Sequence, residues 1–254
     1  MMIDTHAHLY LDDFDSDRES LMERCLNKGV ERVYLPNIDS STTDSMLKME
    51  QVFPDHAFPM MGLHPCSVKE NVEHELQEVK RWLDQRNFAA IGETGLDFYW
   101  DITFKEEQIE AFSRQIEWAM EYQLPIVIHA RNSIRECIDL IGSKQNGTLK
   151  GIFHCFSGTL KQADEIIKLG FLMGIGGLIT FKNSNLSQVV QKIGLKHLVL
   201  ETDSPYLTPS PHRGKRNESS YIPYIAEKIA SVQGLTTKEV ANVTSKNALA
   251  LYKL

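Results

Sequence analysis

The stretch Pro125-Ile126-Val127-Ile128-His129 is an unbroken run of apolar residues that ends in a histidine. A strand that is buried on both faces has apolar side chains at every position, whereas a half-exposed strand alternates apolar with polar residues. The run therefore predicts a central strand of a parallel sheet, with a polar group at the point where the strand ends.

Short apolar runs of this kind recur along the whole chain. The expected strands are Met1–Ile3, Arg32–Pro36, Ala57–Gly62, Phe88–Gly92, Pro125–Ile128, Lys150–Phe153, Phe171–Ile175 and His197–Leu200. Stretches with helical spacing lie between them, as in Ile109, Phe112 and Ile116. Near the end, Thr236 followed by Glu239 forms a capping box that predicts the start of a helix.

The repeated strand and helix patterns predict the fold. Eight such units in a chain of 254 residues match the usual size of a TIM barrel. A doubly wound open sheet is the alternative, although no GxGxxG pattern follows the first strand. Neither a linker-like change of composition nor a short repeat divides the chain. We therefore expect an α/β protein with one domain, a (β/α)8 TIM-like barrel over residues 1–254.

Composition limits the kind of protein this is. The net charge of -7 argues against a protein that passively coats DNA or a membrane, but it leaves room for an enzyme that grips phosphates locally. Cys25, Cys66, Cys137 and Cys155 form no CxxC pair, so we expect free thiols. Neither a signal peptide nor a membrane-spanning run is evident, which predicts a cytoplasmic protein. No feature demands a subunit interface, and we expect a monomer.

Residues that can bind metal ions follow five of the predicted strands. They are His6 and His8 after the first strand, Glu93 after the fourth, His129 after the fifth, His154 after the sixth and Asp203 after the eighth. In a barrel the C-terminal ends of the strands converge on one rim. A single histidine in such a place is more often a packed or surface residue. The recurrence of donors at matching positions favours a metal centre.

The chemistry of these donors narrows the choice of metal. Four imidazoles and two carboxylates without a thiolate favour Zn, Mn, Fe or Co, and Mg is also compatible. Six donors exceed the three protein ligands of a typical catalytic zinc site. Two divalent ions with Glu93 between them use the donors more naturally.

The other titratable residues are weaker candidates for the metal centre. Glu201 is a second ligand candidate beside Asp203, which is the better one. We expect His56, His74 and His197 to be solvated, and the acidic residues between Asp12 and Asp17 to form a solvated loop and the start of a helix.

At these positions the sequence resembles the TatD-type metal-dependent deoxyribonucleases of the amidohydrolase superfamily. The matching segments are Asp4-Thr5-His6-Ala7-His8, Gly62-Leu63-His64-Pro65, Ile91-Gly92-Glu93-Thr94-Gly95-Leu96-Asp97, His129-Ala130-Arg131, Phe153-His154-Cys155-Phe156-Ser157-Gly158, Gly176-Gly177 with Thr180-Phe181-Lys182-Asn183, Glu201-Thr202-Asp203-Ser204-Pro205-Tyr206-Leu207 and Arg213-Gly214-Lys215-Arg216-Asn217-Glu218. They occur in the family's order and span nearly the whole chain.

The resemblance implies a function and roles for particular residues. It implies that the six donors bind the metal ions and that a metal-activated water hydrolyses DNA, as in a 3′-5′ exodeoxyribonuclease acting on single-stranded ends. Asp203 would orient or deprotonate the water, and Glu93 is the second expected catalytic residue. His64 and Arg131 would support the ligands or contact phosphate.

The sequence departs from the family pattern at three places. Cys66, Asn132 and Ser219 stand where the family often has His, Asp and Pro. None of these changes removes a ligand, so they concern substrate contact. The fourth strand supplies Glu93 and not the carboxylated lysine of many binuclear amidohydrolases, which disfavours a dihydroorotase-like or phosphotriesterase-like activity.

Two segments are candidates for holding DNA. The basic cluster His212-Arg213-Gly214-Lys215-Arg216 offers Arg213 to a phosphate, because guanidinium groups bind phosphate oxygens in pairs. A solvated loop is the alternative. Phe98, Tyr99 and Trp100 could stack on an unpaired base or pack in the core.

Three other functions are compatible with the same donors. One is ester cleavage on a charged tRNA by a D-aminoacyl-tRNA deacylase, and another is hydrolysis of a small amide or lactone. The third belongs to a different class, a metal-binding scaffold without catalysis. A complete ligand set argues against this last interpretation.

Overall fold

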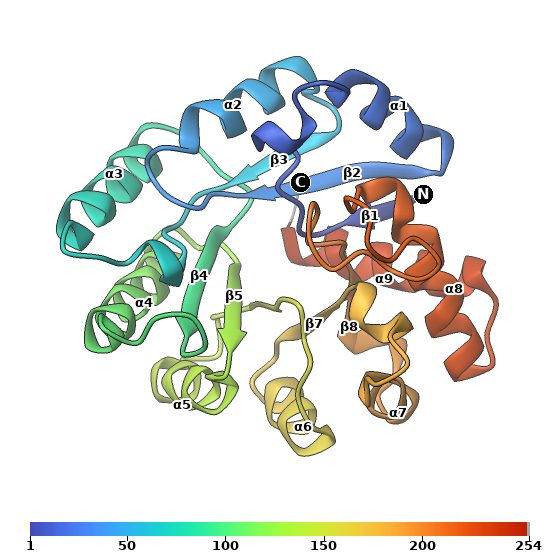
Figure 1. The fold of residues 1–254 in the computed structure, drawn as a ribbon. Helices are drawn as coiled ribbons and strands as arrows, with labels where there is room; N and C mark the ends of the chain where they lie inside the picture. Colours follow the sequence, from blue (N-terminus) through green and yellow to red (C-terminus); the bar gives the residue numbers. More distant parts are fainter. Residues whose placement is uncertain (253–254) are drawn as a thin grey trace.

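The computed structural model of the chain describes residues 1–252 and shows a ring of parallel strands with helices packed around its outside (Figure 1). The strands are β1 (Met2–Asp4), β2 (Val30–Pro36), β3 (Ala57–Met60), β4 (Ile91–Asp97), β5 (Ile126–Arg131), β6 (Gly151–Phe153), β7 (Leu172–Ile175) and β8 (Leu198–Leu200). The helices are α1 (Arg18–Asn27), α2 (Thr43–Val52), α3 (Val72–Gln85), α4 (Lys105–Glu121), α5 (Ile134–Lys144), α6 (Leu160–Lys168), α7 (Leu186–Lys192), α8 (Ile222–Gln233) and α9 (Thr237–Tyr252).

The strands close into a barrel. Strands β1 to β3 pair in sequence order, as do β4 to β8, and every pair is parallel. An isolated bridge between Met61 and Ile91 joins the two groups on one side. On the other side the backbone N–H of Thr5 donates to the carbonyl of Leu200 at 3.0 Å. Because the first and last strands adjoin, the predicted (β/α)8 barrel is confirmed and the open doubly wound sheet is excluded.

Strands β4 and β5 extend further than the apolar pattern predicted. Glu93 and His129 therefore lie within strands and not after their ends, and the prediction was wrong on this point. The parallel ladder continues through the pairs Gly95–His129 and Asp97–Arg131. Backbone pairing does not require apolar side chains, so a strand can continue where its polar side chains face a functional site.

The predicted helices are present, and one of them closes an end of the barrel. The capping box is formed as expected: Glu239 Oε2 accepts from the backbone N–H of Thr236, whose hydroxyl accepts from the backbone of Glu239. Helix α9, which begins there, packs through Tyr252 on the ring of Tyr34. One buried residue from each of six strands shares this cluster with α9: Ile3, Tyr34, Met60, Val127, Ile152 and Val199.

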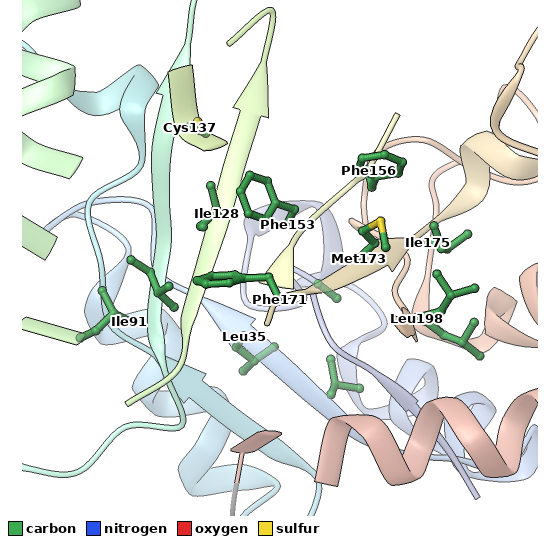
Figure 2. Packing of buried hydrophobic residues seen from close by; sticks show 14 of the residues in the cluster. Leu35, Ile91, Ile128, Cys137, Phe153, Phe156, Phe171, Met173, Ile175 and Leu198 are labelled. Atoms are coloured by element: carbon green, nitrogen blue, oxygen red, sulfur yellow. The ribbon is translucent and has the colours of Figure 1, made fainter. Parts of the chain in front are cut away.

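A larger core lies between the strands and the outer helices. Figure 2 shows Phe153 and Phe171 meeting edge to face, with ring centres 5.7 Å apart, and Ile128 beside Phe153 on the neighbouring strand. This packing holds strands β5 and β6 in fixed positions. The strand ends opposite α9 can therefore present side chains with little freedom to move.

Two further expectations concern the chain as a whole. All four cysteines are free thiols, as predicted. Among residues 1–252, no helix combines the length and the apolar composition that crossing a bilayer requires.

Candidate metal centre

The structure brings all six predicted ligands together around the carboxylate of Glu93. They come from β4, from β5 and from the segments that follow β1, β6 and β8. Most of them are buried, and Glu93 itself is 2% exposed. Residues as far apart in sequence as His6 and Asp203 are neighbours here because parallel strands of a barrel end at one rim.

One oxygen of Glu93 faces the N-terminal histidines. Glu93 Oε2 lies 3.0 Å from His6 Nε2 and 3.6 Å from His8 Nε2. Asp203 Oδ1 lies 3.7 Å from each of the same two nitrogens. These four side chains place nitrogen and oxygen donors around one small volume.

The other oxygen of Glu93 faces a second group of histidines. Glu93 Oε1 lies 2.8 Å from His129 Nδ1 and 3.0 Å from His154 Nε2. His64 Nε2 approaches the same oxygen at 3.4 Å. The carboxylate therefore stands between two sets of donors, as a bridging ligand would.

The role of His64 follows from its second nitrogen. His64 Nδ1 accepts a hydrogen bond from the backbone N–H of Cys66 at 3.0 Å. In the neutral ring the proton must then be on Nε2, which makes that nitrogen a donor and not a metal ligand. His64 is thus placed to donate to Glu93 or to an anion in the site.

The donor set fits divalent metal ions. Three overlapping sets each place their nitrogen and oxygen atoms within 4.8 Å of one another, and no thiolate is included: His6, His8 and Asp203; His6, Glu93 and His154; and His64, Glu93 and His129. Burial would raise the pKa of Glu93, but the surrounding histidines lower it well below its usual value. Burial and His154 lower the pKa of His6, which favours the neutral form that binds metals. Burial would lower the pKa of His154, but the charge of Glu93 raises it well above its usual value, so a protonated ring compensates the buried carboxylate. Divalent ions bound by the neutral rings would supply the same positive charge in place of the protons.

Two further carboxylates lie behind the ligand rings. Asp97 Oδ2 lies 2.8 Å from His129 Nε2, and Glu201 Oε1 lies 3.4 Å from His154 Nδ1 and accepts from the backbone of Cys155. Glu201 therefore stands behind a ligand and not among the donors. Asp97 was not among the residues predicted to act at the site. Its place at the site could have been predicted from the spacing. Alternate residues of an extended strand share a face, and Asp97 is four positions from Glu93.

A cavity of about 550 Å³ opens onto the metal centre. Its walls include the ligands Glu93, His129, His154 and Asp203 together with His64, Arg131, Cys66, Trp100 and Tyr206. A volume of this size is typical of a site for a small molecule or for part of a polymer. The predicted contacts His64 and Arg131 both line it.

The basic cluster at residues 212–216 lies elsewhere. The guanidinium of Arg213 sits 3.6 Å from the centre of the Phe181 ring and donates to the Thr208 carbonyl, and the residue is not part of the cavity wall. Arg216 pairs with Asp17 at 2.8 Å. Asp17 also binds Arg24, so the expectation that this carboxylate is simply solvated was wrong.

The remaining histidines lie outside the donor groups. His74 is exposed, while His56 and His197 are partly exposed. His56 Nδ1 lies within hydrogen-bonding distance, 2.8 Å, of the Glu31 carbonyl. None of these three residues is among the donors that surround Glu93.

The chain is similar to known metal-dependent hydrolases along its whole length. The sequence model of a family described as TatD related DNase matches residues 3–253. The chain is 38% identical to the uncharacterized metal-dependent hydrolase YabD of Bacillus subtilis, with 100% of both chains covered. It is 28% identical to a 3′-5′ ssDNA/RNA exonuclease TatD of Pectobacterium carotovorum, again with 100% of both covered. The crystal structure of YjjV, a TatD homologue from Escherichia coli, superposes with a TM-score of 0.94 at 26% identity, covering 100% of this chain and 98% of that one.

Proposed function

The chain belongs to the TatD-related DNase family of metal-dependent hydrolases, and on this premise we propose that it is a 3′-5′ exodeoxyribonuclease acting on single-stranded DNA. The observation that carries the proposal is the carboxylate of Glu93 between two donor groups, at the floor of a cavity with Arg131 in its wall. The relative that is named for 3′-5′ exonuclease action on single strands supports the choice of substrate.

The two donor groups are assigned to two divalent ions, Zn, Mn or Mg. His6, His8, Asp203 and Oε2 of Glu93 would hold one ion. His129, His154 and Oε1 of Glu93 would hold the other. Ions in such sites supply Lewis-acid chemistry, because they make a water nucleophilic near neutral pH and stabilise negative charge on phosphoryl oxygens.

Asp203 is the proton acceptor in this proposal. Burial would raise its pKa, but the neighbouring His8 and the charges of His154 and His6 lower it, so the carboxylate is ionised at neutral pH. It lines the cavity and can reach an attacking water from one side. The backbone N–H of Asp203 donates to the carbonyl of His6 at 2.9 Å, which fixes the residue beside the first donor group.

Arg131 and His64 hold the phosphodiester. Arg131 is exposed, lines the cavity and pairs with no carboxylate among residues 1–252, so its guanidinium is free to bind phosphate oxygens. His64 presents an N–H toward the same space. Together they compensate for an overall charge of -7 with a local excess of donors at the site.

A direct comparison of substrates tests this function. One preparation of the metal-loaded enzyme is given single-stranded DNA, a D-aminoacyl-tRNA and a simple lactone, each with and without chelator. We expect chelator-sensitive cleavage of the DNA at a kcat/KM at least a hundredfold above that for the other two. Faster deacylation of the tRNA or faster opening of the lactone would overturn the proposal in favour of acyl chemistry. Inactivity on all three with several metals would favour a non-catalytic metal-binding protein.

A further inference from the structure

The loop between β4 and α4 exposes neighbouring aromatic rings. Tyr99 is 53% exposed and Trp100 is 68% exposed, and their rings meet edge to face with centres 4.9 Å apart. Most large apolar side chains of this protein are buried, so adjacent exposed rings are unusual. The metal centre and the proton acceptor leave these rings unexplained.

Arg131 joins these rings to the cavity. Its guanidinium carbon lies 4.2 Å from the centre of the Tyr99 ring and 5.3 Å from that of Trp100. Arg131 and Trp100 both form part of the cavity wall. The exposed ring of Trp100 and a guanidinium that pairs with no carboxylate among residues 1–252 therefore lie close together in the cavity wall.

The loop is fixed relative to the metal centre by Asp97. One carboxylate oxygen of Asp97 accepts hydrogen bonds from the backbone N–H groups of Tyr99 at 2.9 Å and Trp100 at 3.1 Å. The other oxygen lies 2.8 Å from Nε2 of His129. The same buried side chain thus positions the exposed rings and a metal ligand, so a group stacked on the rings has a defined place relative to the site.

The far side of the loop is also anchored. Lys69 pairs with Asp101 at 2.8 Å, and the ammonium of Lys105 lies 4.6 Å from the centre of the Phe98 ring. Phe98 is only partly exposed, in contrast to its two neighbours. Tyr99 and Trp100 therefore project from a loop whose backbone is bound by Asp97 and whose neighbouring side chains Phe98 and Asp101 have partners of their own.

We propose that Tyr99, Trp100 and Arg131 form a nucleotide platform, in which the base beside the cleaved phosphate stacks on Trp100 while Arg131 binds that phosphate. Stacking on aromatic rings is tolerant of sequence because every base has a π face. In a duplex the faces and edges of a base are already occupied, so the platform takes an unpaired nucleotide. This inference rests on the proposed function and adds the group that selects single strands.

Binding to strands with and without a terminal base tests the platform. The metal-loaded protein is titrated with fluorescent single-stranded oligonucleotides whose last linkages are non-hydrolysable phosphonates. One oligonucleotide is intact, and the other lacks the bases of its last two 3′ nucleotides. For the wild type we expect the missing bases to weaken binding about fivefold or more, as for the loss of one stacked base.

Three variants assign this difference to the platform. Trp100→Ala should reduce the ratio of the two Kd values to within about twofold, and Trp100→Phe should retain most of it because a flat ring remains. Ile102→Ala is the matched control, since Ile102 is a comparably exposed side chain, at 63%, on the same loop. We expect it to keep the full ratio.

The outcomes separate this inference from the proposed function. If Trp100→Ala keeps the wild-type ratio, or the wild type binds both oligonucleotides equally, the platform is overturned even for an enzyme that cuts DNA. If the ratio behaves as expected but natural DNA is not cleaved, the platform stands and the proposed nuclease activity fails. Absence of binding to either oligonucleotide overturns the platform.

Discussion

The carboxylate of Asp97 lies 2.8 Å from Nε2 of His129, whose Nδ1 faces Glu93 at the same distance. Burial would raise the pKa of Asp97, but hydrogen bonds from His129, Tyr99 and Trp100 lower it, so the carboxylate is ionised. An ionised carboxylate can only accept, which places the proton of the neutral ring on Nε2 and leaves the lone pair of Nδ1 for a metal ion.

Asp97→Asn should therefore weaken metal binding without removing a ligand. Partners that orient a metal-bound histidine typically contribute 10- to 100-fold to affinity. We expect the concentration of free metal that restores half of the activity to rise by about that factor. Asp101→Asn, on the same loop but exposed, should leave it within twofold. An unchanged metal requirement in Asp97→Asn would show that the hydrogen bond does not orient His129.

Asp203→Asn should separate turnover from binding. The amide cannot accept the proton of an attacking water, so we expect kcat to fall at least a hundredfold while the Kd for a non-hydrolysable oligonucleotide changes by less than about threefold. Metal content measured on the same samples controls for loss of an ion. A variant that keeps its metal and turns over at the wild-type rate would remove Asp203 from the proposed role.

Gly95→Ala should destabilise the protein at the contact between strands β4 and β5. Gly95 has a φ of +132°, and a Cβ there would collide with the carbonyl oxygen of His129. We expect the free energy of unfolding to drop by about 3 kcal/mol, from backbone strain and displacement of β5. Gly147→Ala is the control, since Gly147 also has positive φ, +89°, but open space around it. Denaturant unfolding of both variants checks this, and equal losses would contradict the steric argument.

The ion pairs of Asp17 should stabilise the fold in a pH-dependent way. The hydrogen bond from Arg216, followed by that from Arg24, lowers the pKa of Asp17 from 3.8 to about 2. The folded state thus binds the proton more weakly than the unfolded state, so this stabilisation is nearly complete above about pH 5 and is lost progressively as the pH falls through 4 toward 2. A partly exposed network of this kind contributes about 1 kcal/mol after solvent screening.

Thermal unfolding of Asp17→Asn tests this directly. We expect Tm to be about 2–4 °C lower than that of the wild type at pH 7, with the gap narrowing as the pH is lowered from 5 toward 3. Asp13→Asn, a neighbouring exposed carboxylate without a side-chain ion pair among residues 1–252, should show no such gap. A difference that stays constant with pH would mean that the charge of Asp17 is not responsible.

Much of this site could be predicted from local sequence. Strands buried on both faces are readable as apolar runs, and a donor near the end of each run is necessarily brought toward the others when the strands close into a barrel. Glu93 and His129 were identified in this way even though their strands continue past them. The full lengths of β4 and β5 could not be predicted, because backbone hydrogen bonds between strands can continue past the last apolar residue.

Interactions set by tertiary contact could not be predicted. The tautomer of His64 depends on a hydrogen bond from Cys66, and the support of His129 depends on how its ring turns toward Asp97. Arg216 belongs to a basic cluster in the sequence, yet it is paired with a carboxylate 199 positions away. The sequence also could not show that the side chain of Trp100 is exposed, because an aromatic residue beside a strand can pack inward or outward.

The most direct test of the central claim is a time course of product release from single-stranded DNA labelled at its 3′ or 5′ end, with and without chelator. We predict that the 3′ label appears first as a mononucleotide, that the 5′-labelled strand shortens stepwise, and that chelator stops both. Release of the 5′ label first, internal cuts, or cleavage that persists in chelator would contradict the assignment of a metal-dependent 3′-5′ exonuclease to the centre around Glu93.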